Sequence, residues 1–79
     1  MRLPRDISST ELIKLLQKFG YQISRQKGSH IRLTTTKQGE HHITILNHDP
    51  IRLGTLSSII TDIANHFKKT KEEIAKEIF

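Results

Sequence analysis

Four of the five histidines in this 79-residue sequence lie between residues 25 and 52, in the most basic part of the chain. That segment has a net charge of +3, from five basic and two acidic residues: Arg25, Lys27, Arg32, Lys37 and Arg52 against Glu40 and Asp49. A neutral imidazole can remove the proton from a ribose 2′-hydroxyl, and nearby Arg or Lys side chains can stabilise the charge that develops on phosphorus. These residues therefore suggest cleavage of RNA, because DNA has no 2′-hydroxyl.

Strand alternation separates the histidines by the face on which they lie. Residues 30–36 alternate between polar and apolar types, so if Ile31 faces the core, His30 and Arg32 point the other way. His41 and His42 are adjacent in a second alternating run, so their side chains are expected on opposite faces and are poorly placed to share a metal ion. We expect His30 and Arg32 on the outward face, with Arg25 and Lys27 at its edge.

Other kinds of chemistry find little support in the sequence. The chain has no cysteine, which excludes disulfides, thiolate zinc sites and a cysteine nucleophile. No pair of histidines has the spacing of a helical zinc site, and no glycine-rich phosphate loop or Ser/His/Asp arrangement is recognisable. We therefore expect no metal and no cofactor, and we expect His66 to be structural.

Two segments that position these residues have the pattern of helices. The first is expected from about Ser9 to Phe19, because Ser8 and Glu11 have the spacing of a capping box and Gly20 follows where helices commonly end. The second is expected over residues 56–67 with Thr55 as its cap, and its apolar residues share one helical face: Leu56, Ile59, Ile60, Ile63, Ala64 and Phe67. A capping-box spacing at residues 70–73 predicts a short last helix that ends near Ile78.

Three strands are expected between the two long helices, over residues 21–25, 30–36 and 41–46, with turns at Lys27-Gly28 and Gln38-Gly39. Short connections imply an antiparallel meander. For the last two strands we favour the register with a three-residue loop, which places His30 opposite His48; the alternative has a longer loop and places His30 opposite Leu46. The first hairpin requires a three-residue loop or a bulge if the apolar residues of its two strands are to lie on the same face of the sheet.

The expected fold class is α+β with the order α-β-β-β-α, a three-stranded antiparallel sheet with helices on one face, and a short C-terminal helix. We expect one domain over residues 1–79, with the other sheet face left to solvent or a partner. No apolar run approaches the length of a membrane span, and the N-terminus lacks the core of a signal peptide. We therefore expect a cytoplasmic protein that does not bind a membrane.

Four segments together resemble the HicA-type toxins, also called YcfA-like mRNA interferases: Phe19-Gly20-Tyr21, Arg25-Gln26-Lys27-Gly28-Ser29-His30, Thr44-Ile45-Leu46-Asn47-His48 and Gly54-Thr55-Leu56. The resemblance extends from about Leu12 to Phe67. It implies a fold like the double-stranded-RNA-binding domain, cleavage of mRNA, and a HicB-type antitoxin as partner. One departure is Leu46, because the family commonly has proline at that place before its last histidine.

The resemblance assigns His30 as the catalytic residue and Gly28 as the turn at the site, and it leaves His48 as a candidate helper. RNA would be bound by four residues around that turn: Arg25, Lys27, Ser29 and Arg32. The alternative is a non-catalytic RNA-binding module of the same fold. A helix-turn-helix that binds DNA is disfavoured, because the last helix carries three glutamates against two lysines and would repel phosphate.

Overall fold

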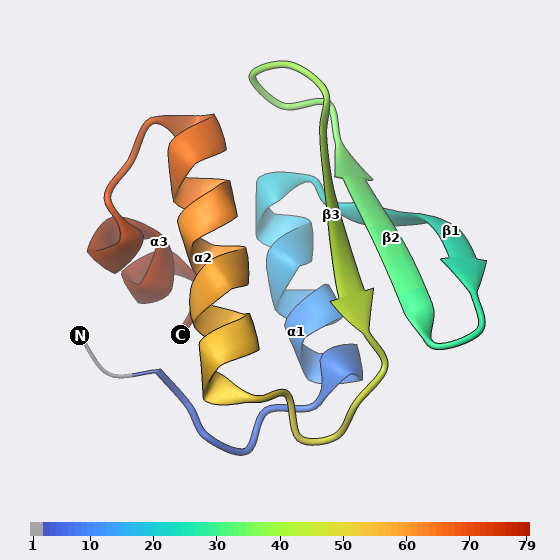
Figure 1. Ribbon diagram of the computed structural model, residues 1–79. Helices are drawn as coiled ribbons and strands as arrows, with labels where there is room; N and C mark the ends of the chain where they lie inside the picture. Colours follow the sequence, from blue (N-terminus) through green and yellow to red (C-terminus); the bar gives the residue numbers. More distant parts are fainter. Residues whose placement is uncertain (1–2) are drawn as a thin grey trace.

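The structure is a computed structural model that describes residues 3–79 and has the expected α+β order (Figure 1). Helix α1 (Ser9–Leu16) continues into the 3-10 turn η1 (Gln17–Phe19). The strands are β1 (Gln22–Lys27), β2 (His30–Thr35) and β3 (His41–Leu46), which form one antiparallel sheet in the order β1-β2-β3. Helix α2 (Leu53–Phe67) and helix α3 (Lys71–Ile78) complete the chain.

The two long helices cover one face of the sheet, as the apolar patterns predict. Figure 1 shows α1 and α2 on the same side of the strands, with α3 against α2 and away from the sheet. The core is formed by fully buried side chains from all of these layers: Leu12, Leu16, Leu33, Ile45, Leu56, Ile60, Ile63 and Ile74. Across residues 3–79, no helix is long and apolar enough to cross a membrane.

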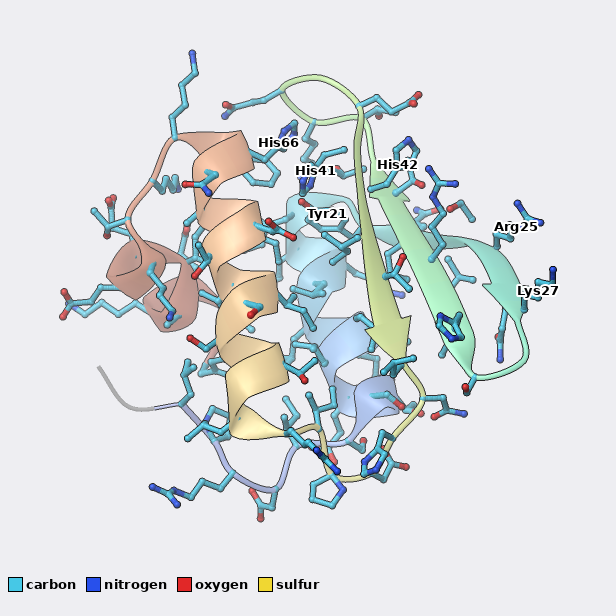
Figure 2. The ribbon with its side chains drawn as sticks, viewed as in Figure 1. Tyr21, Arg25, Lys27, His41, His42 and His66 are labelled. Atoms are coloured by element: carbon cyan, nitrogen blue, oxygen red, sulfur yellow. The ribbon has the colours of Figure 1, made fainter. Side chains whose placement is uncertain are left out.

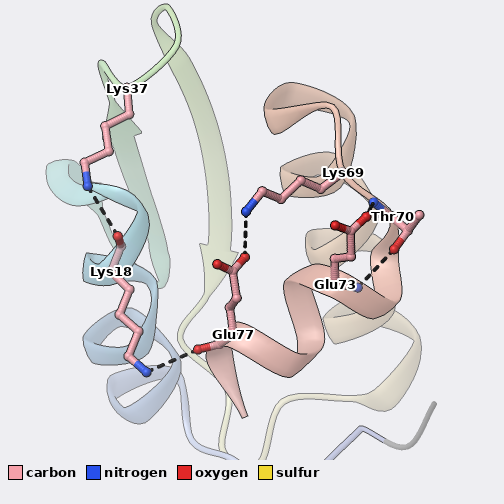
Figure 3. Close-up of polar contacts among 6 residues, drawn as sticks. All are labelled: Lys18, Lys37, Lys69, Thr70, Glu73 and Glu77. Atoms are coloured by element: carbon pink, nitrogen blue, oxygen red, sulfur yellow. Dashed lines mark hydrogen bonds and ion pairs between the residues drawn. The ribbon is translucent and has the colours of Figure 1, made fainter.

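Two of the three helix starts are capped as predicted. The Ser8 hydroxyl accepts a hydrogen bond from the amide of Glu11 at 3.1 Å. Thr70 and Glu73 form the full reciprocal capping box, and the hydrogen bonds from Thr70 hold the pKa of the Glu73 carboxyl below its usual range (Figure 3). The predicted Thr55 cap is wrong, because α2 starts three residues earlier, at Leu53, with extended Arg52 at its cap.

The first hairpin contains a bulge, one of the two predicted alternatives, but its turn lies one residue further along the chain than predicted. Lys27 pairs with His30, so the two-residue turn is Gly28-Ser29 and β1 reaches Lys27. Gly28 has a φ of 60°, which a hairpin turn of type II′ requires at its first central position. The register shifts between Ile23 and Arg25. Because of this β-bulge, Arg25 and Lys27 pair with Arg32 and His30 and lie on the same face of the sheet as these residues.

The predicted register of the second hairpin is wrong. His30 lies opposite Leu46, and the loop comprises residues 36–40. The observed register pairs Ile31 with Ile45 and Leu33 with Ile43, all buried, whereas the predicted one would pair Ile31 with polar Asn47. Even doubling a loop costs only about 0.6 kcal/mol in closure entropy, which is less than the burial of one aliphatic side chain contributes.

Candidate functional site

His30 is the first residue of β2 and lies in the middle of a row across the sheet. It pairs with Lys27 on one side and with Leu46 on the other, and it is exposed. Lys27, Gly28, Ser29 and His30 line an open depression of about 550 Å³. Three of the residues predicted for the site are therefore brought directly against the predicted catalytic histidine.

The next row places Arg25 directly opposite Arg32, and both side chains are exposed. We call Arg25, Lys27, His30 and Arg32 the basic end of the outer face; Figure 2 shows Arg25 and Lys27 at the sheet margin, away from the helices. Within residues 3–79, none of these four side chains makes a hydrogen bond or an ion pair. Like charges in opposed cross-strand positions are destabilising, so nothing in the fold accounts for this arrangement.

Several lysines elsewhere are engaged by the protein itself. Lys18 Nζ donates to the carbonyl of Glu77 at 3.2 Å, and Lys37 Nζ donates to the carbonyl of Lys18 at 3.4 Å (Figure 3). Lys69 Nζ lies 3.0 Å from Glu77 Oε2. Several lysines of the helices and of the loop after β2 therefore have a carbonyl or a carboxylate as partner. Within residues 3–79, the cations of the basic end have no such partner.

The far end of the outer face carries a chain of hydrogen bonds. Glu40 Oε2 accepts from His42 Nε2 at 2.9 Å, and His42 Nδ1 lies 2.7 Å from Thr34 Oγ1. Thr34 Oγ1 lies 2.7 Å from the hydroxyl of Ser24, the bulge residue. We call Ser24, Thr34, Glu40 and His42 the hydrogen-bonded end. Its polar side chains bind one another.

His48 does not lie opposite His30, in contrast to the prediction. The strand ends at Leu46, and the amide of His48 turns back to the carbonyl of Leu46 at 2.8 Å. His48 Nδ1 lies 3.1 Å from the carbonyl of Pro50, and because a carbonyl only accepts, Nδ1 carries the proton and Nε2 is left free. The amide of Asn47 donates to the carbonyl of Ser29 at 2.7 Å, so this loop is fastened to the turn beside His30.

A second pocket, for which the sequence carries no signal, lies at the end of β3. This pocket has a volume of about 260 Å³ and is lined by five residues: Leu46, His48, Ile51, Arg52 and Thr55. In the sequence, Arg52 is part of the basic segment, and Thr55 is a predicted helix cap within the Gly54-Thr55-Leu56 segment. No pattern along the chain brings these residues together, because the pocket forms where the loop after β3 folds against the first turn of α2.

His41 and His66 belong to the packed side of the molecule, as expected for His66. Their rings are stacked with centroids 4.5 Å apart, and His41 Nδ1 lies 2.7 Å from the hydroxyl of Tyr21 (Figure 2). Burial, and the charge that His66 would carry if protonated, lower the pKa of His41. Burial also raises the pKa of Tyr21, so the phenol stays protonated and donates to His41.

Histidine and carboxylate side chains do not gather into a metal-binding cluster in the described part of the chain. No group of three or more His, Asp or Glu residues within residues 3–79 is arranged to hold a metal ion. His41 and His42 lie on opposite faces of β3, as predicted, with His41 against Tyr21 and His42 against Thr34.

Comparison with known proteins identifies one family. Residues 9–64 match the family model described as the HicA toxin of bacterial toxin–antitoxin systems. Neither the search of curated proteins nor the search of solved structures finds a match. The matched segment contains the whole sheet, the basic end and the pocket after β3, and it leaves α3 outside.

Proposed function

The chain belongs to the HicA toxin family of bacterial toxin–antitoxin systems, and we propose that it is an endoribonuclease that cleaves mRNA at the basic end. The observation that carries this proposal is the position of His30. Its imidazole is exposed in the middle of a row, with Lys27 on the neighbouring strand and two arginines in the next row. This arrangement supplies a proton acceptor beside several groups that bind phosphate.

In the proposed reaction His30 accepts the proton of a ribose 2′-hydroxyl. The 2′-oxygen then attacks the adjacent phosphorus, and the bond from phosphorus to the 5′-oxygen of the next nucleotide breaks. The attack leaves a 2′,3′-cyclic phosphate on one product, and the leaving 5′-oxygen takes up a proton from water and becomes the 5′-hydroxyl of the other. Lys27 and Arg32 stabilise the negative charge on the phosphoryl oxygens, and no step requires a metal ion.

The remaining residues of the predicted site have supporting roles in this proposal. Arg25 and the Ser29 hydroxyl bind phosphates on either side of His30. Gly28 sets the turn, and it is required for its positive φ rather than by crowding, because a Cβ at this position would have nothing within 4 Å. His48 remains a candidate catalytic helper, through the Nε2 that the bond from Nδ1 to Pro50 leaves free.

Membership of the family implies an antitoxin as partner. We propose that this partner is of the HicB type and that it silences the toxin by covering the exposed basic end. The proposed substrate is mRNA, so we place the activity in the cytoplasm. Double-stranded DNA is not a proposed substrate, since the reaction requires the 2′-hydroxyl.

The experiment that tests the function identifies the ends of the products. Purified protein is incubated with an end-labelled RNA, with and without a chelator, and the new 3′ ends are examined for cyclic phosphate. We expect cyclic phosphate and 5′-hydroxyl ends, unaffected by the chelator, and no cleavage where a 2′-deoxynucleotide replaces the ribonucleotide at the cut. RNA that is bound but never cut would contradict the enzyme and favour the non-catalytic RNA-binding module.

A further inference from the structure

The pocket after β3 adjoins the proposed site through the pairing of the strands. Leu46 forms one wall of the pocket and is also the partner of His30 across the sheet. Paired residues of neighbouring antiparallel strands have Cα atoms about 4.5–5.5 Å apart. A group held in the pocket is therefore one strand spacing away from His30, on the side opposite Lys27.

This order across the sheet matches the order of groups around a ribose. The base is attached to C1′, the attacking hydroxyl to C2′, and the scissile phosphate to C3′, on consecutive ring carbons. With the 2′-hydroxyl at His30 and the phosphate toward Lys27, the base is directed toward Leu46. The row therefore accommodates one nucleotide with its three functional parts in sequence.

The chemistry of the pocket suits a nucleobase. Leu46 and Ile51 provide apolar walls, and Leu46 is 46% exposed although it is a large aliphatic residue. Arg52 and the Thr55 hydroxyl supply hydrogen-bond donors, and His48 adds a free ring nitrogen. The volume of about 260 Å³ is below the range of about 300–1,000 Å³ typical for drug-sized ligands, so the pocket fits a fragment of a nucleic acid rather than a whole cofactor.

We propose that this pocket binds the base of the nucleotide whose 2′-hydroxyl attacks, and that Arg52 and Thr55 determine which base is accepted. The proposal rests on the proposed endoribonuclease function and specifies how its substrate is chosen. Donor side chains favour a base edge with adjacent acceptors, and arginine characteristically pairs with O6 and N7 of guanine. We therefore expect guanine to be preferred immediately 5′ of the cut.

The test measures binding of the four nucleoside 3′-monophosphates, which resemble the 3′ end of the proposed product, by NMR titration of the ¹⁵N-labelled protein. Ribose 5-phosphate, which has no base, is the reference. We expect guanosine 3′-monophosphate to shift the amides of Leu46, Arg52 and Thr55 as well as those of the turn, and to bind about tenfold more tightly than the reference. Equal affinity for all five compounds, with shifts confined to the turn, would overturn the proposal.

Variants then assign the selectivity to the pocket. Arg52→Ala is expected to reduce the discrimination between bases by about 5- to 10-fold, the lower end of the range for a good bidentate contact, while Thr55→Val, which keeps the shape, has a smaller effect. Lys76→Ala removes one charge from α3 and should change neither affinity nor selectivity. A base preference that survives Arg52→Ala and Thr55→Val unchanged would locate selection elsewhere and overturn the inference.

The same variants distinguish failure of this inference from failure of the enzyme. If wild-type protein binds nucleotides selectively but never cuts RNA, the endoribonuclease is contradicted while the base pocket is supported. If it cuts RNA but the base 5′ of the cut is unrestricted in wild type and in Arg52→Ala, the enzyme stands and the pocket is contradicted.

Discussion

The outer face of the sheet has two solvent-exposed ends on the same strands, and their polar side chains are arranged differently. At the hydrogen-bonded end, hydroxyls, an imidazole and a carboxylate bind one another in sequence. At the basic end, two arginines oppose each other across the strands, and their charges are directed to solvent. The first arrangement can be explained by the fold alone, whereas the second stabilises nothing within the protein.

The difference supports the basic end as the proposed ligand site. An unfavourable contact that nothing in the fold compensates, such as the pairing of Arg25 with Arg32, is expected at a functional site. The repulsion between Arg25 and Arg32 is relieved when a phosphate lies between them, since an anion converts two unfavourable neighbours into two partners. His30 lies in the same end, so the proposed phosphate binding and the proposed cleavage fall in one place.

The largest expected effect is on the rate of RNA cleavage, and it should distinguish His30 of β2 from His42 of β3. His30→Ala should lower the rate of RNA cleavage by about 10²–10⁴, the usual contribution of a general base. It should change the free energy of unfolding by less than about 0.5–1 kcal/mol, because the side chain is exposed and unbonded. His42→Ala is the matched control and should keep its cleavage rate within a few fold. Similar losses for both variants would remove the functional distinction between the ends.

A second comparison uses the salt dependence of RNA binding to the His30→Ala protein. Three cations at the basic end predict a log–log slope of roughly −2 to −3, so affinity should fall about 15- to 60-fold between 50 and 200 mM salt. Lys27→Ala should reduce the slope by about 0.7. Lys69→Ala should leave it unchanged, because Lys69 is paired with Glu77. An equal change from both lysine variants would show that RNA does not select the basic end.

Stability should respond in opposite directions at the two ends. Thr34→Val removes the hydroxyl that links Ser24 to His42 and should lower the free energy of unfolding by about 0.5–1.5 kcal/mol with cleavage retained. Arg25→Thr removes a like-charge pair and should raise it by about 0.2–1 kcal/mol while RNA affinity falls. Chemical denaturation and RNA binding measure both. Destabilisation by Arg25→Thr would mean that the arginine has a structural role.

The smallest expected effect is on the pH dependence of stability, and it distinguishes His41 from His42 on the two faces of β3. The pKa of His41 is lower in the folded chain than its ordinary value of 6.5. The unfolded chain therefore binds more protons below that pH, and stability is complete above about pH 6.5 and declines as the pH falls through the folded pKa. His41→Gln should flatten this decline in denaturation curves between pH 5 and 8, and His42→Ala should not. An unchanged profile for His41→Gln would contradict the assignment.

Local sequence patterns were sufficient for the order of the elements and for the starts of α1 and α3. The caps at Ser8 and Thr70 act within one turn of the backbone, so their effect is encoded in four consecutive residues. Thr55 failed as a cap because the loop after β3 enters α2 earlier, at Arg52. That entry is set by tertiary contacts, including the hydrogen bond from the amide of Ile51 to the carbonyl of Ile7.

By itself, the sequence determined the outward residues of β2, because strand alternation is a local property: His30 and Arg32 lie on the outer face as predicted. It did not determine which residue faces which. The register of β2 and β3 was decided by buried pairing of Ile31 with Ile45, and the loop to α2 by contacts of Asn47 and Asp49 with Ser9. Both depend on residues far apart in the chain. Only the tertiary structure therefore moved His48 away from His30, put Leu46 in its place, and formed the pocket beside it.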